Sequence, residues 1–168
     1  MVVRGLAGRT YTDKVRDGGE FKEEEPDVTL PTFTDRVYIA PVDAPEEKDV
    51  LIGTKSGEMT FAVTNAARIN GAPEPVDIVV WNPYADASPG DLPPPSYEKF
   101  VCLEPGLVAA HKTLAPGAVA ELSQKMVAQK SSARPGGGPG APDSCPESNG
   151  ETSWYQSYRI RCKQPARA

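Results

Sequence analysis

The chain has 168 residues, a length that suits one domain, and its formal net charge is −5. Acidic residues are spread along the chain. This argues against nucleic acid as a partner, because phosphate binding needs a clustered basic surface. No run approaches the roughly 18 apolar residues of a membrane span, and the first residues lack the apolar core of a signal peptide. We therefore expect a cytoplasmic protein with no membrane partner.

The residues that most often bind metals are few and scattered. The cysteines are Cys102, Cys145 and Cys162; they form no C-x-x-C pair, and an odd number at this spacing is not a disulfide framework. His111 is the single histidine and has no ligand type beside it, so a zinc site is not expected. Glycine-rich phosphate loops and G-x-S-x-G elbows are also missing from the sequence. The sequence predicts no metal and no cofactor.

Short segments rich in β-forming residues recur along the chain, with turn signals between them. Residues 16–27 read as a charged, solvated loop. Residues 118–130 hold good helix formers, so a helix there stays open beside a strand at 119–126. The pattern favours an all-β sandwich or barrel. The expected strands lie around Tyr11 and at residues 34–39, 50–54, 59–65, 77–81, 97–103 and 119–126.

The composition changes after residue 130. Residues 131–150 are rich in Gly, Pro and Ser and almost without aliphatic side chains, so they cannot offset the entropy cost of ordering. Residues 154–168 are basic and aromatic, which suits either an interaction tail or an extension outside the core. We therefore expect one domain at residues 1–130 and a disordered tail at residues 131–168.

Three positions are candidates for chemistry. Glu104 follows an apolar run and precedes Pro105, where a rigid scaffold aims a side chain, although an ordinary turn looks the same. Asp35 beside Arg36 fits a surface ion pair or a carboxylate that accepts hydrogen bonds from sugar hydroxyls. Trp81 is expected either as a core side chain or as the wall of a sugar pocket.

Two segments in this order resemble the glucose-6-phosphate 1-epimerase family of the aldose 1-epimerase (galactose mutarotase-like) superfamily. They are D-I-V-V-W-N-P at residues 77–83 and Y-E-K-F-V-C-L-E-P-G at residues 97–106. Further similar segments lie at Gly5-Leu6 with Tyr11 and Asp13, at T-D-R-V-Y (34–38) and at L-A-P-G (114–117). The resemblance covers about residues 5–126, and the two segments together are more specific than either alone.

The resemblance implies a large antiparallel β-sandwich of the galactose mutarotase-like type, incomplete at its N-terminus. It implies an isomerase that interconverts the α and β anomers of hexose 6-phosphates, with Glu104 as the catalytic base and Asp35 holding sugar hydroxyls. It implies no metal or organic cofactor, and a monomer when complete. The family's catalytic histidines and phosphate-binding arginines lie upstream of these segments, and His111 matches no catalytic position. The alternative is a non-catalytic β-sandwich fragment that binds carbohydrate or a protein.

Overall fold

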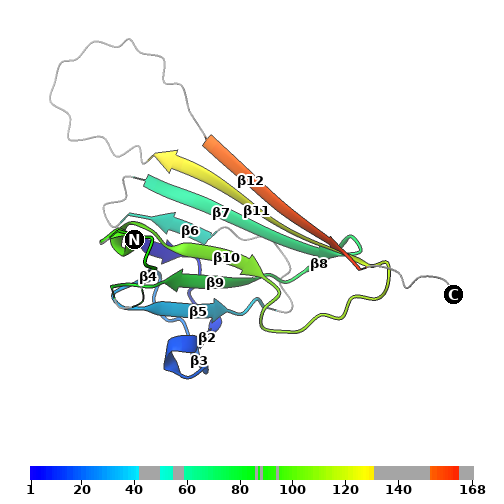
Figure 1. Cartoon of the computed structure of the whole chain (residues 1–168), viewed down its shortest axis with the longest axis horizontal. Coiled ribbons are helices and arrows are strands. Elements are labelled where there is room, and N and C mark those ends of the chain that lie inside the picture. Colours follow the sequence, from blue (N-terminus) through cyan, green and yellow to red (C-terminus); the bar gives the residue numbers. More distant parts are fainter. Residues whose placement is uncertain are drawn as a thin grey trace, which may run out of the picture.

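The chain folds into two antiparallel β-sheets that face one another (Figure 1). The computed structural model describes residues 1–41, 50–54, 59–85, 87, 89–93, 95–130 and 152–162. One sheet has seven strands, in the order β12 (Thr152–Arg161), β11 (Val119–Lys130), β7 (Met59–Ile69), β6 (Val50–Gly53), β1 (Val2–Arg4) and β4 (Asp27–Thr29), with β8 (Ala72–Glu74) paired to β7. The other has five, in the order β10 (Cys102–Gly106), β9 (Asp77–Asn82), β5 (Thr34–Tyr38), β2 (Thr10–Asp13) and β3 (Gly19–Lys22).

The core lies between the two sheets. The seven-stranded sheet contributes Val3, Val50 and Val63, each fully buried. The five-stranded sheet contributes Tyr38 and Val80, which are also fully buried. Burying one face of each sheet against the other is the defining feature of a β-sandwich, so the predicted all-β sandwich is confirmed.

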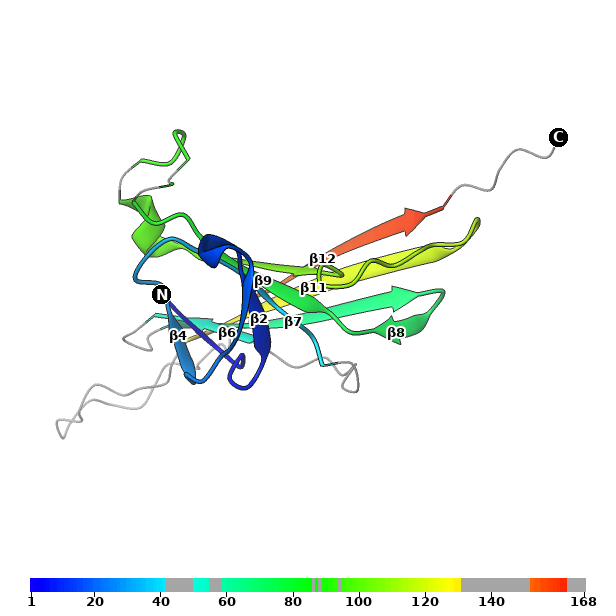
Figure 2. The same cartoon turned by 90° about the horizontal axis from the view of Figure 1, so that it is seen from below.

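Period-two patterning located most of the strands. The strands expected at residues 34–39, 50–54 and 77–81 are β5, β6 and β9, and the strand expected at 59–65 continues to Ile69 as β7. In Figure 2, the long strands β7, β11 and β12 extend beyond the shorter sheet. The seven-stranded sheet therefore presents more surface than the five-stranded sheet covers.

The helix considered for residues 118–130 does not form. This segment is strand β11, which pairs with β7 from Ala120 opposite Ile69 to Lys130 opposite Met59. Its helix-forming residues are overridden because a long neighbouring strand can satisfy the backbone of the whole segment.

The expectation that residues 16–27 form a charged, solvated loop is also wrong in part. It contains β3 and begins β4, and Glu23 within it is only 7% exposed. The phenol of Tyr38 donates a 2.7 Å hydrogen bond to the Glu23 carboxylate. A charged residue is seldom buried without such a partner, and no local sequence pattern identifies one that lies on another strand.

The strand predicted at residues 97–103 lies further along the chain. A short 3₁₀ helix, η2 (Ser96–Lys99), comes first, and β10 begins at Cys102. Glu104 and Pro105 therefore lie within a strand and not in the turn after it. Proline is tolerated there because β10 is an edge strand, whose outer side needs no backbone donor.

The predicted disorder of residues 131–168 is wrong for ten of them. Thr152–Arg161 form β12, which pairs with β11 from Val119 opposite Arg161 to Ala128 opposite Thr152. Alternating polar and aromatic residues supply the β-propensity, and β11 supplies the backbone partner. Residues 131–151 and 163–168 lie outside the described residues.

Candidate functional site

Strand register brings the two predicted site residues to one face of the five-stranded sheet. Glu104 lies opposite Val79, and Val79 lies opposite Val37 on β5. Asp35 lies opposite Trp81, which lies opposite Cys102 on β10. Cross-strand partners point to the same side of a sheet, and residues two apart share that side. Glu104 and Asp35 therefore share a face.

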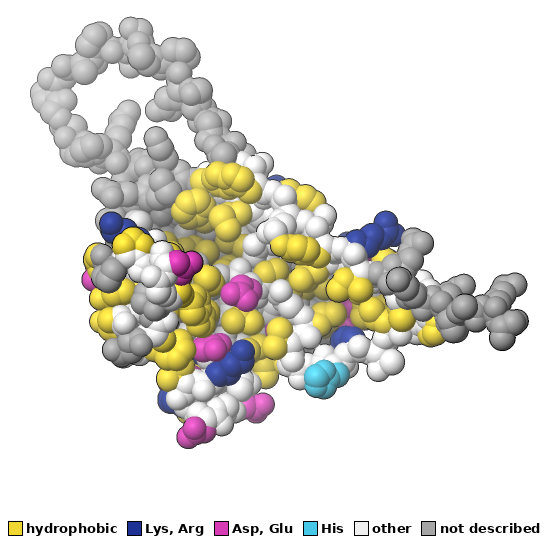
Figure 3. Space-filling model, viewed as in Figure 1, with side chains coloured by type: hydrophobic (Ala, Val, Ile, Leu, Met, Phe, Trp, Pro, Cys, Tyr) yellow, Lys and Arg dark blue, Asp and Glu magenta, His cyan; other side chains and the backbone are white. Residues whose placement is uncertain are grey.

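We name this surface the open face and define it by Asp35, Trp81, Cys102 and Glu104. It is opposite the core face, because the intervening residues Val80 and Leu103 are buried. Figure 3 looks onto the five-stranded side of the molecule, where acidic side chains lie among hydrophobic ones. Two strand spacings and two residues of rise place the Cα atoms of Asp35 and Glu104 about 12 Å apart.

Glu104 is exposed on a strand that the other sheet holds in place. The side-chain amide of Gln124 on β11 donates to the Leu103 carbonyl at 3.0 Å and to Asn65 Oδ1 at 3.1 Å. These bonds fix the backbone beside Glu104. The pKa of the Cys102 thiol is raised, first by burial and then by the negative charge of Glu104. The two side chains are therefore close enough to interact electrostatically.

Asp35 is partly buried and has the cation of Lys14 beside it. Lys14 Nζ lies 3.5 Å from the Asp35 carboxylate, and its own side chain is 52% exposed. Lys14 begins the 3₁₀ helix η1 (Lys14–Arg16), which follows β2 and is capped by Asp13, whose carboxylate accepts from the Val15 amide at 3.0 Å. This cap fixes the start of η1, and so the backbone position from which the Lys14 side chain extends toward Asp35.

The opposite side of β5 is anchored by a buried polar cluster. The Arg36 guanidinium lies 3.4 Å from the carboxylates of both Asp13 and Glu23. Burial is the largest cause that raises the pKa of Tyr38, and the Glu23 carboxylate raises it further while Arg36 lowers it. Tyr38 thus stays protonated and donates to Glu23. This cluster fixes the strand on which Asp35 points outward.

Trp81 lies between Asp35 and Cys102 and is partly exposed, so it is not the core side chain that one interpretation expected. Its ring centroid is 6.2 Å from that of Phe100. An aromatic surface beside carboxylates can contact the apolar side of a ligand while the carboxylates bind its polar groups. The open face therefore has both parts of a polar-ligand site.

His111 lies in the connection between β10 and β11, where it is exposed. The start of this connection is held by Asp77, whose carboxylate accepts hydrogen bonds from the amides of Val108 at 2.9 Å and Ala109 at 2.7 Å. Within the described ranges, no group of three His, Cys, Asp or Glu residues could hold a metal ion.

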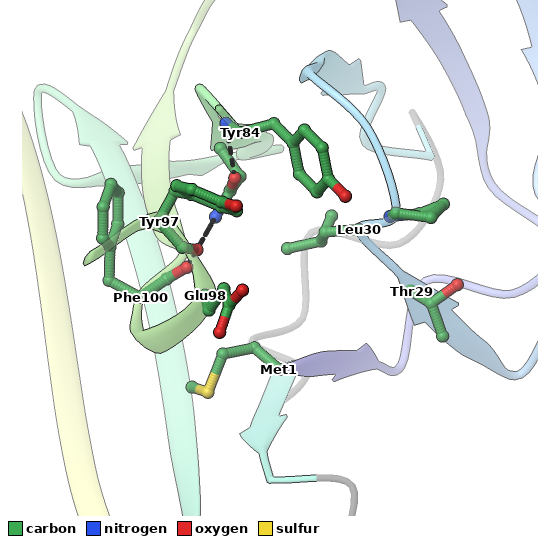
Figure 4. Close-up of a pocket in the computed structure, with 9 residues that line it drawn as sticks. Met1, Thr29, Leu30, Tyr84, Tyr97, Glu98 and Phe100 are labelled. Atoms are coloured by element: carbon green, nitrogen blue, oxygen red, sulfur yellow. Dashed lines mark hydrogen bonds between the residues drawn. The ribbon is translucent and has the colours of Figure 1, made fainter. Parts of the chain in front are cut away.

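A separate pocket of about 370 Å³ lies at one end of the sandwich (Figure 4). Asn82 organises it: its amide donates to the carbonyls of Tyr97 at 2.8 Å and Phe100 at 2.7 Å, and its oxygen accepts from the Tyr84 amide at 2.8 Å. Tyr84 is held at a left-handed φ of 52°. No pattern in the sequence indicated that Tyr84 and Tyr97 would meet, with ring centroids 4.9 Å apart.

Fold and site together define a class: an antiparallel β-sandwich whose open face presents two carboxylates and an aromatic ring. The chain is similar to two curated proteins that are both named "Putative glucose-6-phosphate 1-epimerase". The protein from Escherichia coli (strain K12) is 30% identical over 126 residues, which are 74% of this chain and 38% of the relative. The protein from Salmonella typhimurium (strain LT2) is 34% identical over 104 residues, which are 61% of this chain and 31% of the relative.

The chain thus spans less than two fifths of the length of either relative. No family model matches it, and no solved structure matches it. Among the described residues, no helix is long and apolar enough to cross a membrane.

Proposed function

We propose that this chain carries the catalytic base and a sugar-binding carboxylate of an enzyme that interconverts the α and β anomers of hexose 6-phosphates. The observation that carries the proposal is the shared open face of Glu104 and Asp35, with Trp81 beside Asp35. The similarity to two proteins named for glucose-6-phosphate 1-epimerase supports the same reaction.

The reaction needs one base and one acid. Glu104 removes the proton of the C1 hydroxyl, the bond from C1 to the ring oxygen breaks, and the ring oxygen takes a proton. The open-chain aldehyde rotates about its C1–C2 bond, and the reverse steps close the ring as the other anomer. Glu104 is exposed on a strand anchored from the other sheet, as a base that must meet a diffusing sugar requires.

The other open-face groups suit binding. Asp35 accepts hydrogen bonds from sugar hydroxyls, and Trp81 contacts the apolar side of the ring. Lys14 beside Asp35 is a cation that a phosphate can approach. The acid that protonates the ring oxygen belongs, in this proposal, to the part of the relatives' length that this chain does not span, because His111 lies outside the open face as defined.

A chimera tests the role of Glu104. The aligned stretch of the Escherichia coli relative is replaced by the matching stretch of this chain, and anomer exchange of glucose 6-phosphate is measured by NMR exchange spectroscopy. Glu104→Gln should slow exchange by about 10²–10⁴-fold, the usual contribution of a general base, while circular dichroism shows an unchanged fold.

Glu20→Gln in the same chimera is the matched control. Glu20 is exposed and opposite Thr12, so it has the same facing as Glu104 but lies four strands away in the sheet. Its loss should leave the exchange rate unchanged. A Glu104→Gln rate within about three-fold of the parent (under 1 kcal/mol of barrier) would rule out the base assignment. Retained binding of glucose 6-phosphate without exchange in the parent chimera would favour the non-catalytic sugar-binding alternative.

A further inference from the structure

β12 is an edge strand of unusual character. It is ten residues long and, among the described residues, pairs with β11 alone, because it ends the seven-stranded sheet. Side chains that stay largely exposed include Trp154 at 52%, Tyr155 at 71%, Tyr158 at 56% and Ile160 at 65%. An edge strand is normally protected by proline, a bulge or charged side chains. Thr152–Arg161 contain no proline, and their charged residues, Arg159 and Arg161, lie at one end of the strand.

The apolar side chains of β12 continue the core face of its sheet. Trp154 lies opposite Met126, which lies opposite the fully buried Val63. Trp154, Tyr158 and Ile160 are separated by even numbers of residues and so share this face. The ring of Trp154 contacts Phe61 at a centroid distance of 6.4 Å. The strand thus presents an apolar face, and no other described strand pairs with the backbone along its outer edge.

We propose that β12 pairs antiparallel with β12 of a second copy of this chain, which joins the two seven-stranded sheets into one. The two-fold axis that relates such strands is perpendicular to the sheet, so the core faces of both copies lie on the same side. Only residues of the same facing can then lie opposite one another. A register centred on Gln156 meets this condition. It places Trp154 of each copy opposite Tyr158 of the other, so two such pairs form.

The sequence of β12 is complementary to itself in this register. Aromatic pairs across strands stabilise a sheet, and like charges directly opposite destabilise it. Arg159 lies opposite Ser153 of the second copy, so no like charges face each other within Thr152–Ile160. Arg159 also has its own counterion, Glu121, at 3.3 Å within the same copy. This self-complementarity favours a second copy over an unrelated strand.

The inference is independent of the function proposed for Glu104, which lies on the other sheet. The family resemblance implied a monomer for the complete protein. The β12–β12 pairing is proposed for this chain. The second copy would remove the exposed edge, the feature of a sheet that most promotes aggregation.

Two double variants that differ only in the sign of one charge test the register. Trp154→Lys with Tyr158→Lys places lysine opposite lysine at two positions across the axis. Trp154→Lys with Tyr158→Glu removes the same aromatic rings but places lysine opposite glutamate. Sedimentation equilibrium should give a dimer dissociation constant at least about ten-fold higher for the lysine–lysine variant than for the lysine–glutamate variant.

The control variant is Val15→Lys with Val108→Lys, two exposed apolar residues outside β12. It adds the same charge as the lysine–lysine variant, and its dimer dissociation constant should equal that of the wild-type chain. Circular dichroism melts verify that all variants fold. A monomeric wild-type chain would overturn the proposal. Equal dissociation constants for the two β12 variants would overturn this register, and open-ended oligomers that persist in the lysine–lysine variant would overturn two-fold pairing.

Discussion

Cys102 and Glu104 are two residues apart on the same side of β10, and the carboxylate raises the pKa of the thiol beyond the effect of burial. A negative neighbour disfavours the thiolate, so Glu104→Gln should lower the pKa of Cys102. Burial is unchanged and keeps the pKa above its usual value. At a fixed pH near 8.5 more thiolate is then present, and alkylation of Cys102 should be about two-fold faster or more.

Peptide mass spectrometry after timed iodoacetamide treatment measures this rate at several pH values, with Cys162 as the internal reference. An unchanged pH profile of Cys102 would mean that the Glu104 carboxylate does not reach the thiol. This readout needs no enzymatic activity, so it tests the geometry of the open face separately from the proposed reaction.

The hydroxyl of Tyr38 is the shortest hydrogen-bond donor to the buried Glu23 carboxylate, at 2.7 Å. Tyr38→Phe removes it from a residue that is 7% exposed and leaves the longer bonds from Arg36 at 3.4 Å and from the Glu25 amide at 3.2 Å. The free energy of unfolding should fall by about 1–3 kcal/mol, the usual contribution of a hydrogen bond to a charged group. Urea denaturation measures it. Tyr155→Phe removes a hydroxyl from a side chain that is 71% exposed and should change the free energy by less than about 0.5 kcal/mol; equal effects would contradict the role of Tyr38.

At the scale of elements, Asn82 joins the end of β9 to the segment that leads into β10. It is 2% exposed and takes part in three hydrogen bonds. Asn82→Ala should destabilise the protein by about 2 kcal/mol or more. Asn82→Asp should be worse, because both lost donors face carbonyl oxygens, which would repel the buried charge.

Asn70 provides the matched control for these variants. It is exposed and adopts a φ of 51°, and its side-chain oxygen accepts from the Val119 amide at 3.0 Å, which is its one side-chain bond among the described residues. Aspartate keeps that acceptor and tolerates the left-handed backbone, so Asn70→Asp should have little effect on thermal unfolding. A melting temperature for Asn82→Asp above that of Asn82→Ala would show that the two donors of Asn82 are dispensable.

At the scale of the whole molecule, the chain by itself should not catalyse anomer exchange. In the proposed reaction Glu104 accepts the C1 proton, but the described open face presents no histidine that could deliver one to the ring oxygen. The net charge of −5 also opposes a phosphate dianion. NMR exchange rates of glucose 6-phosphate with and without the chain should agree. Exchange above the buffer rate that His111→Ala abolishes would instead assign the acid role to His111.

Local patterns were enough to predict the fold class and several strands. β5, β6 and β9 were predicted correctly, because alternation and buried apolar runs are properties of consecutive residues. The sequence also showed Glu104 next to Pro105, but it did not show that both lie inside a strand. Proline indicates a turn unless the strand is known to be at the edge of a sheet.

Tertiary structure decided what depends on pairing between distant segments. The sequence by itself determined that the chain is built from β-strands and that Asp35 and Glu104 stand out as candidates. Only the pairing register of the strands placed both side chains on the open face. A slip of one residue in one strand would have turned its side chain to the opposite face. Likewise, Glu23 became buried because Tyr38 lies beside it, and β12 became a strand because β11 offered a free edge. Such contacts join residues far apart in the chain, so no local pattern encodes them.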